Sequence, residues 1–159
     1  MRTEIEFIKL PDGTQPVLWL LNDIRQKATS DPDMMQMLKL IANGLVFLKN
    51  HGMPLAKQQY FVDELEDGRP YTIRLIKELR DHVPLFEFRV NWKSGAFRLI
   101  FFEYIHGNVQ ILVMTKAVIK YETYSEEFEK IADESDRLYA AFTRNPEQYI
   151  NLEGVEQHE

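Results

Sequence analysis

Apolar and polar residues alternate along the middle of the chain, which is the pattern of β-strands with one buried face. Between 86 and 93 the apolar positions are Phe86, Phe88, Val90 and Trp92, with polar residues between them. The segment 96–105 is almost entirely apolar, as a central strand is. Ser94-Gly95 between these two segments is a hairpin signal. The pattern predicts strands over 72–80, 86–93, 96–105 and 109–116.

A helical pattern, with apolar residues at three- and four-residue steps, flanks these strands on both sides. Asp31 and Pro32 suit the N-cap and the first position of a helix, and Gly52 suits its end. Because the first two helices are joined by a short connection, we expect them to form an antiparallel hairpin. The predicted helical segments are 15–27, 31–50 and 125–144.

The order of these elements defines the expected fold class. A strand at 3–10 precedes the helical hairpin, the antiparallel strands follow, and one helix comes last. This grouping indicates an α+β fold, with the helices on one face of an antiparallel meander sheet. We expect residues 1–145 to form a single domain. Residues 146–159 form an acidic tail, which we expect to be partly disordered.

The composition narrows the class of protein. The chain has 159 residues, of which 45% are hydrophobic and 28% are charged, as is typical of a globular domain, and it has no cysteine. The lack of cysteine excludes disulfides and thiol catalysis. No apolar run reaches the roughly 20 residues of a membrane span, and the first residues lack the apolar core of a signal peptide. We therefore expect a soluble, cytoplasmic protein with no membrane partner.

Charge is distributed unevenly along the chain. The net charge of −6 disfavours a general nucleic-acid binder. Residues 121–159 hold 11 acidic and 3 basic side chains, whereas the window 69–98 holds seven basic and three acidic ones. The predicted sheet can therefore present a locally positive face, although such charges often only solvate a surface. The acidic tail could fold over that face and mask it.

Five segments, in this order along the chain, are similar to segments of one known family. They are Ile5–Val17, with a strand, a glycine turn and a Pro-Val helix start; Lys77-Glu78-Leu79-Arg80; Phe97-Arg98-Leu99-Ile100; Leu112–Lys116 followed by Lys120; and the acidic helix Glu126–Glu134. Over about residues 3–135 the chain resembles the RelE/ParE toxin superfamily, in its phage-derived HigB-like branch. It departs from that family at Ala117, where a second lysine is common, in the long loop 54–73, and in its net acidity.

The resemblance implies a RelE-like fold and the function of a toxin in a type II toxin–antitoxin system. Toxins of this family are commonly metal-independent, ribosome-associated mRNA endonucleases, called mRNA interferases. The implied partners are the ribosome, messenger RNA and a cognate antitoxin, for which the resemblance suggests a helix-turn-helix protein. No cofactor is implied.

Cations on the predicted sheet are the candidate site residues. When a ribose 2′-OH attacks the neighbouring phosphorus, negative charge grows on the phosphoryl oxygens, and nearby cations stabilise it. Arg80 and Arg98 are the candidate phosphate-stabilising pair, because a guanidinium can bind phosphate through two hydrogen bonds. Lys116 is a candidate for phosphate contact or proton transfer. Further candidates for RNA binding are Arg89, Lys93, Lys120, Tyr104 and His106.

Each candidate also has a structural interpretation. Arg80 could pair with Glu78 or Glu87, Arg98 could be paired in the interior, and the lysines could be ordinary surface groups. Tyr104 could be a core residue, and a histidine in a turn is often simply exposed. The four histidines are widely separated along the chain, so their spacing predicts no metal site.

Two other functions remain open. One is a toxin-fold protein of a phage or mobile element that binds a protein partner without catalysis, which Ala117 and the net acidity favour. The other is a ParE-like inhibitor of DNA gyrase. RNA cleavage on translating ribosomes would separate the mRNA interferase from both, and a DNA-damage response would identify the gyrase inhibitor.

Overall fold

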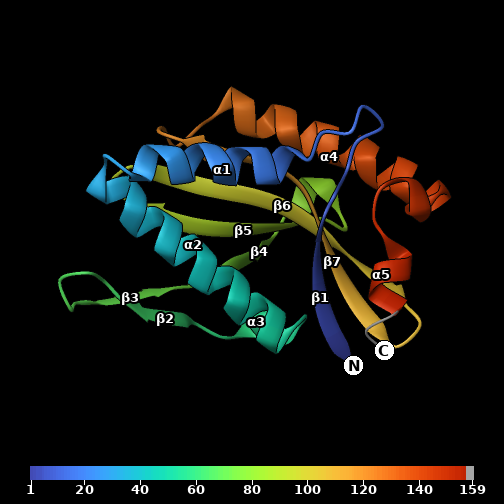
Figure 1. The fold of residues 1–159 in the computed structure, drawn as a ribbon, viewed down its shortest axis with the longest axis horizontal. Coiled ribbons are helices and arrows are strands. Elements are labelled where there is room, and N and C mark those ends of the chain that lie inside the picture. The colour runs from blue at the N-terminus through green and yellow to red at the C-terminus, as the bar shows by residue number, and fades with distance from the viewer. Residues whose placement is uncertain (157–159) are drawn as a thin grey trace.

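A five-stranded sheet with helices on both of its faces forms the body of the protein in the computed structural model, which describes residues 1–156 (Figure 1). The elements in chain order are β1 (Arg2–Phe7), α1 (Pro16–Ala28), α2 (Pro32–His51), α3 (Leu55–Gln58), β2 (Phe61–Glu64), β3 (Pro70–Ile73), β4 (Ile76–Glu78), the 3₁₀ turn η1 (Arg80–His82), β5 (Phe86–Trp92), β6 (Gly95–His106), β7 (Val109–Lys120), α4 (Glu126–Arg144), the 3₁₀ turn η2 (Pro146–Gln148) and α5 (Leu152–Glu156). The predicted α+β class is confirmed, with its N-terminal strand, helical hairpin, antiparallel strands and C-terminal helix.

The main sheet has the strand order β1-β7-β6-β5-β4. Strands β4 to β7 form an antiparallel meander, as the sequence predicts, and β1 joins its edge parallel to β7. In the β5–β6 ladder, Phe88 is opposite Leu99 and Arg89 is opposite Arg98. This register decides which of the cations share a face.

The side of the sheet that packs against α1 and α2, the hairpin-facing side, is mainly apolar. Its core contains Phe88, Val90, Phe97, Leu99, Phe101, Leu112 and Met114 from the sheet and Ile24, Met37, Leu40, Ile41 and Leu48 from the helices. At Gly44, α2 approaches the sheet so closely that an added Cβ would lie 2.9 Å from Cζ of Phe88. A glycine inside this helix is therefore explained by packing.

The opposite side of the sheet, the α4-facing side, has an apolar centre beneath α4. This core contains Ile100, Phe102, Ile111, Val113 and Val118 from the sheet and Ile131, Ala132 and Phe142 from α4. The prediction that all helices lie on one face is therefore wrong. Consecutive residues of β6 are apolar, and neighbouring residues of a strand face opposite sides of the sheet. A sheet that is buried on both faces needs a covering layer on each.

Helix α2 starts and stops at the residues that the sequence indicates. Oδ1 of Asp31 accepts hydrogen bonds from the backbone N–H of Asp33 at 3.0 Å and of Met34 at 3.2 Å. At the other end, Gly52 has a φ of 69°, in the left-handed region that favours glycine. No helix within residues 1–156 is long and apolar enough to cross a membrane.

The segment between the helical hairpin and β5 contains more regular structure than the sequence suggests. It forms the short helix α3 and a separate two-stranded hairpin, β2–β3, that extends away from the main sheet in Figure 1. The strand predicted over 72–80 is divided into the end of β3, β4 and the start of η1. Leu75 and Ile76 are both buried although adjacent, which breaks the alternation of a continuous strand.

The segment 146–156, part of the tail that we expected to be acidic and partly disordered, packs against the rest of the fold. Tyr149, Ile150 and Val155 are buried in the core of the α4-facing side. The backbone N–H of Lys9 donates to the carbonyl of Tyr149 at 2.9 Å, and Arg2 donates to the carbonyl of Val155 at 3.0 Å. Apolar residues within an acidic segment thus anchor it beside β1. Residues 157–159 of the predicted tail lie outside the described part.

Candidate functional site

Cations from three adjacent strands share the α4-facing side, beside its apolar centre. Arg89 of β5 is directly opposite Arg98 of β6, and Lys120 of β7 is opposite Ala96, two residues from Arg98. Their sequence neighbours Phe88, Val90, Phe97, Leu99 and Ile119 pack on the hairpin-facing side. Alternation along each strand therefore places all three cations on the other face, and directly opposite residues have Cβ atoms about 5 Å apart.

Arg98 is held in the interior by a carboxylate. Its Nε lies 3.3 Å from Oε1 of Glu87, and both residues are only 8% exposed. Its Nη1 donates to the carbonyl of Phe97 at 2.9 Å. Burial lowers the pKa of Arg98, the Glu87 carboxylate opposes this effect, and Arg89 adds to it. The interior pairing considered for Arg98 is confirmed, and Glu87 is its partner.

Arg89 is half-buried, and only one N–H group of its side chain is engaged in the described part of the chain. Its Nε donates to the carbonyl of Arg74 at 2.8 Å. Neither of its Nη groups makes a hydrogen bond or an ion pair within residues 1–156. Like charges directly opposite each other destabilise a β-ladder, and Glu87 is the one carboxylate paired with these two arginines in the described chain. The pair therefore retains an unbalanced positive charge.

Tyr71 of β3 binds the edge of β5 at Asn91, two residues from Arg89. Its hydroxyl donates to the carbonyl of Asn91 at 2.8 Å and accepts from the N–H of Asn91 at 3.0 Å, where β5 extends beyond β4. Burial raises the pKa of Tyr71, whereas the bond to Asn91 and the charges of Arg98 and Arg89 lower it. The sequence analysis missed Tyr71 because its segment was predicted to be loop.

Lys120 and Lys93 both lie over aromatic rings. Nζ of Lys120 donates to the carbonyl of Thr123 at 3.1 Å and lies 5.5 Å from the ring centroid of Phe128. Lys93 is in the turn between β5 and β6, with Nζ 5.5 Å from the ring of Trp92. Lys120 continues the row of cations onto β7, whereas the exposed Lys93 lies in the turn after the end of β5.

Lys116 is engaged by α4. Its Nζ lies 3.0 Å from Oε2 of Glu134, and the two side chains are 21% and 24% exposed. Lys116 is opposite Ile100, two residues from Arg98 on the same face. It is therefore near the arginines in the ladder, but its charge is already balanced by a carboxylate of the protein.

Arg80 does not join the arginine pair through the sheet. It lies in η1 and is exposed, so the prediction that Arg80, Arg89 and Arg98 come from three strands is wrong for Arg80. Neither of the ion pairs considered for it forms, because Glu78 pairs with Lys57 and Glu87 with Arg98. Strand β4 ends at Glu78, and Arg80 is the first residue of the polar turn η1 that follows it.

Tyr104 and His106 lie at the far end of β6. Tyr104 packs edge-on against Phe142 with ring centroids 5.1 Å apart, and His106 stacks on Tyr104 at 6.1 Å. Six residues of strand separate Tyr104 from Arg98, a distance of about 20 Å. The core interpretation of Tyr104 is confirmed, and these two residues are not part of the arginine cluster.

Residues 146–156 do not cover the arginine pair. Residues 149–155 pack beside β1, and β1 and β5 are separated by β7 and β6 in the sheet. The masking idea is thus not supported for residues 146–156. Acidic residues nearer to the cations belong to α4 instead, as the pair between Lys116 and Glu134 shows.

We define the arginine site as Glu87, Arg89, Arg98 and Lys120. Two guanidinium groups and an ammonium group lie on adjacent strands, with one buried carboxylate fixing the central arginine. Such an arrangement can bind a phosphate or another oxyanion and stabilise charge that develops on it. Comparison with protein-family models, curated protein sequences and solved structures finds no significant match.

Proposed function

We propose that the protein is the toxin of a type II toxin–antitoxin pair and acts in the cytoplasm as a metal-independent mRNA endonuclease on the ribosome. In this proposal the phosphate of the cleaved linkage binds at Arg89 and Arg98. Lys116 and Lys120 contact the neighbouring backbone, and the exposed Arg80 has a peripheral role. A cognate antitoxin, expected to be of the helix-turn-helix type, binds the toxin and blocks this side of the sheet.

The observation that carries the proposal is the direct opposition of Arg89 and Arg98 in the β5–β6 ladder. Burial is the main cause that lowers the pKa of Arg98, and Arg89 adds to it. Like charges directly opposite each other are expected to destabilise a β-ladder. Local features that reduce stability are expected mainly at functional sites. A bound phosphate would compensate the charge that Glu87 leaves unbalanced, and the unengaged Nη groups of Arg89 would be its donors.

Cleavage without a metal ion requires the protein's own cations to stabilise the transition state. Removing one such donor typically costs about 10²–10³ in rate. Arg98, fixed by Glu87 and by the carbonyl of Phe97, would provide a pre-oriented charge. Arg89 would supply hydrogen bonds to the phosphoryl oxygens.

The test is to express the protein without any antitoxin and to map the 5′ ends of cellular mRNA. The wild-type protein should arrest growth and produce new ends within translated reading frames. Arg89→Ala should lose most of this cleavage, because it removes the available donors. Arg25→Ala, which changes an exposed arginine on α1, is the matched control and should behave as wild type.

Two results would contradict the proposal. One is growth arrest without new mRNA ends, and the other is full cleavage by a folded Arg89→Ala variant. Arrest together with a DNA-damage response would instead identify a gyrase inhibitor.

A second function, a binding module without catalysis, is favoured by one observation. Arg98 and Lys116, two of the predicted catalytic cations, are each paired with a carboxylate of the chain itself. If the face binds a protein and not RNA, affinity for an unstructured RNA should be weak and depend little on salt. An RNA site using three cations should instead lose affinity steeply as salt rises.

A further inference from the structure

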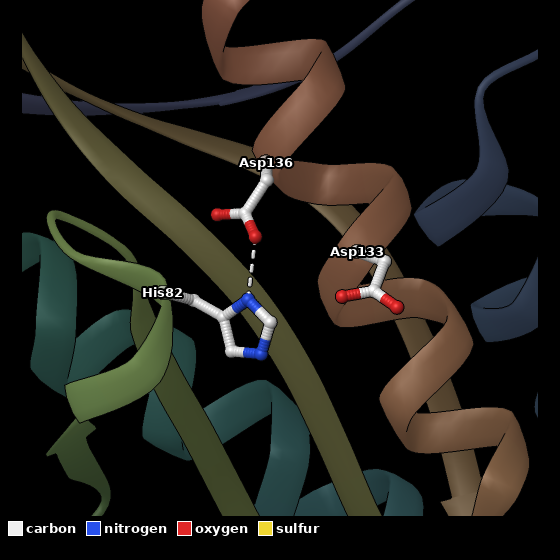
Figure 2. Close-up of side chains that lie close together, drawn as sticks. All are labelled: His82, Asp133 and Asp136. Atoms are coloured by element: carbon white, nitrogen blue, oxygen red, sulfur yellow. Dashed lines mark hydrogen bonds and ion pairs between the residues drawn. The ribbon is translucent and has the colours of Figure 1, made fainter.

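A group of metal-ligand side chains lies between the turn η1 and the middle of α4, apart from the arginine site. Figure 2 shows the three residues, His82 from η1 and Asp133 and Asp136 from α4. One possible ligand atom from each lies within 4.8 Å of the other two. These are the only such group of three found in residues 1–156.

The two aspartates share one face of α4. They are three residues apart, which places their side chains on neighbouring turns of the same side of the helix. Asp136 directs its carboxylate at the imidazole of His82, with Oδ2 2.5 Å from Nδ1 (Figure 2). Asp133 makes no hydrogen bond or ion pair within the described residues. Both carboxylate oxygens of Asp133 are therefore available as ligands beside His82 and Asp136.

Both elements that carry these side chains, η1 and α4, are anchored in the fold. In the η1 loop, the N–H of His82 donates to the carbonyl of Leu79, and the N–H of Leu85 donates to the carbonyl of His82. Leu85 is 1% exposed and anchors the loop in the core beneath α4. On α4, the hydroxyl of Ser135 lies 2.8 Å from that of Thr115. Ligands carried by rigid, anchored elements are pre-organised for binding.

We propose that His82, Asp133 and Asp136 form a binding site for a divalent transition-metal ion, with water completing the coordination. One imidazole nitrogen and two carboxylate oxygens are ligands suited to Zn²⁺, which binds such atoms at about 2.0–2.2 Å. Ligand atoms within 4.8 Å of one another need only small side-chain rotations to meet one ion. Mn²⁺, which is lowest in the general order of affinities, should bind more weakly than Co²⁺.

Binding would tie the η1 loop to α4. An ion held by both elements would replace the hydrogen bond between His82 and Asp136 by a three-point link and would neutralise the two carboxylates. Because it binds only the folded arrangement, the ion should stabilise the protein. The site is separate from the proposed RNA chemistry, so chelation should not abolish mRNA cleavage.

The experiment uses the untagged full chain, freed of metal with a chelator and then desalted. Titration with ZnCl₂ in a calorimeter should show one equivalent bound. At a hundredfold excess over the dissociation constant, the melting temperature should rise by about 5–10 °C. Binding of Co²⁺ should change its visible d–d absorption from that of the aqueous ion, which reports a change in its coordination.

Matched variants make the result decisive. His82→Gln and Asp133→Asn should each weaken Zn²⁺ binding at least about tenfold. Asp133 is exposed and unpaired, so Asp133→Asn should fold normally without metal. Glu127→Gln, on the same helix, and His106→Gln, on β6, should bind Zn²⁺ as wild type does. Retained affinity in Asp133→Asn, or no Zn²⁺ binding by the wild-type chain below millimolar concentrations, would overturn the proposal. Either result leaves the mRNA-cleavage proposal untouched, because no RNA is present.

Discussion

The two sides of the central sheet differ in what they bury. The hairpin-facing side buries closely packed apolar side chains such as Phe88, Phe97 and Phe101. The α4-facing side has a smaller apolar centre, and beside it lie the buried pair of Glu87 and Arg98 and a second arginine directly opposite in the ladder. Buried charges cost desolvation free energy that apolar residues do not.

This difference indicates how stability and function are divided in the fold. The hairpin-facing side supplies the packing that holds the sheet together. The α4-facing side keeps charged groups where apolar ones would be more stable, which is expected of a site and not of a core. Substitutions on the two sides should therefore differ in how much stability they remove.

Removing a ring from the hairpin-facing side should have the largest effect. Phe88 is fully buried and packs edge-on against Phe97, with ring centroids 6.3 Å apart. Phe88→Ala should lower the free energy of unfolding by about 3–5 kcal/mol. Urea denaturation followed by circular dichroism measures this. A loss below about 1 kcal/mol would show that this side is not the stabilising core.

Breaking the buried ion pair should cost somewhat less, and the loss should be reversible. Arg98→Met leaves the carboxylate of Glu87 buried without its partner, so we expect a loss of about 3 kcal/mol. The double variant Glu87→Leu/Arg98→Met should recover most of that stability, because neither charge remains. It should still fail to cleave RNA. If the double variant stays as unstable as Arg98→Met, the pair is a structural requirement and the division proposed here fails.

The ion pair between Lys116 and Glu134 should contribute less, because it is partly exposed. Lys116→Ala should lower the free energy of unfolding by less than about 1 kcal/mol. Lys130→Ala is the control, since Lys130 is 76% exposed and lies 4.0 Å from the same glutamate. We expect no measurable change for it in the same denaturation experiment. A larger loss for Lys130→Ala than for Lys116→Ala would contradict the importance of the pair.

Glu6 should give the smallest effect, and one that depends on pH. Its neighbours Ile5 and Phe7 pack on the hairpin-facing side, so Glu6 faces the other way. Burial, and to a lesser extent Glu4, raises the pKa of Glu6 above its ordinary value of 4.5. The folded state therefore binds the proton more tightly, and this stabilisation is lost as the pH rises through the folded-state pKa. Glu6→Gln should gain stability relative to wild type between about pH 4 and pH 7, by less than about 0.5 kcal/mol. An unchanged difference across that range would contradict the assignment.

The elements of the fold could be predicted from the sequence because local signals define them. Asp31, Pro32 and Gly52 mark the ends of α2, and the alternation around Phe88 marks β5. The second helical layer could also have been predicted, because the apolar run from 97 to 102 leaves no polar face on β6 apart from Arg98. Phe97, Leu99 and Phe101 face one side of the sheet and Ile100 and Phe102 face the other, so both sides need a covering layer.

The sites could be predicted only in part, because they depend on register and on distant contacts. The opposition of Arg89 and Arg98 follows from the position of the turn between β5 and β6. Trp92 pairs with Gly95, so the turn is Lys93-Ser94 and not Ser94-Gly95 as the sequence suggests. His82 and Asp136 are 54 residues apart, and the spacing of the histidines alone gives no sign that they meet. Paired aspartates at i and i+3 on an amphipathic helix would have been the useful signal, but carboxylates at that spacing are common on solvated helices.

The most direct test of the account is cleavage of an mRNA on purified, programmed ribosomes. We predict that the wild-type protein and Arg25→Ala cut the mRNA, and that Arg89→Ala cuts it at least about 100-fold more slowly while melting at the same temperature as wild type or higher, because the like-charge pair is removed. This result would place the chemistry on the α4-facing side of the sheet. Equal rates for wild type and Arg89→Ala, or no cleavage by the wild-type protein, would contradict it.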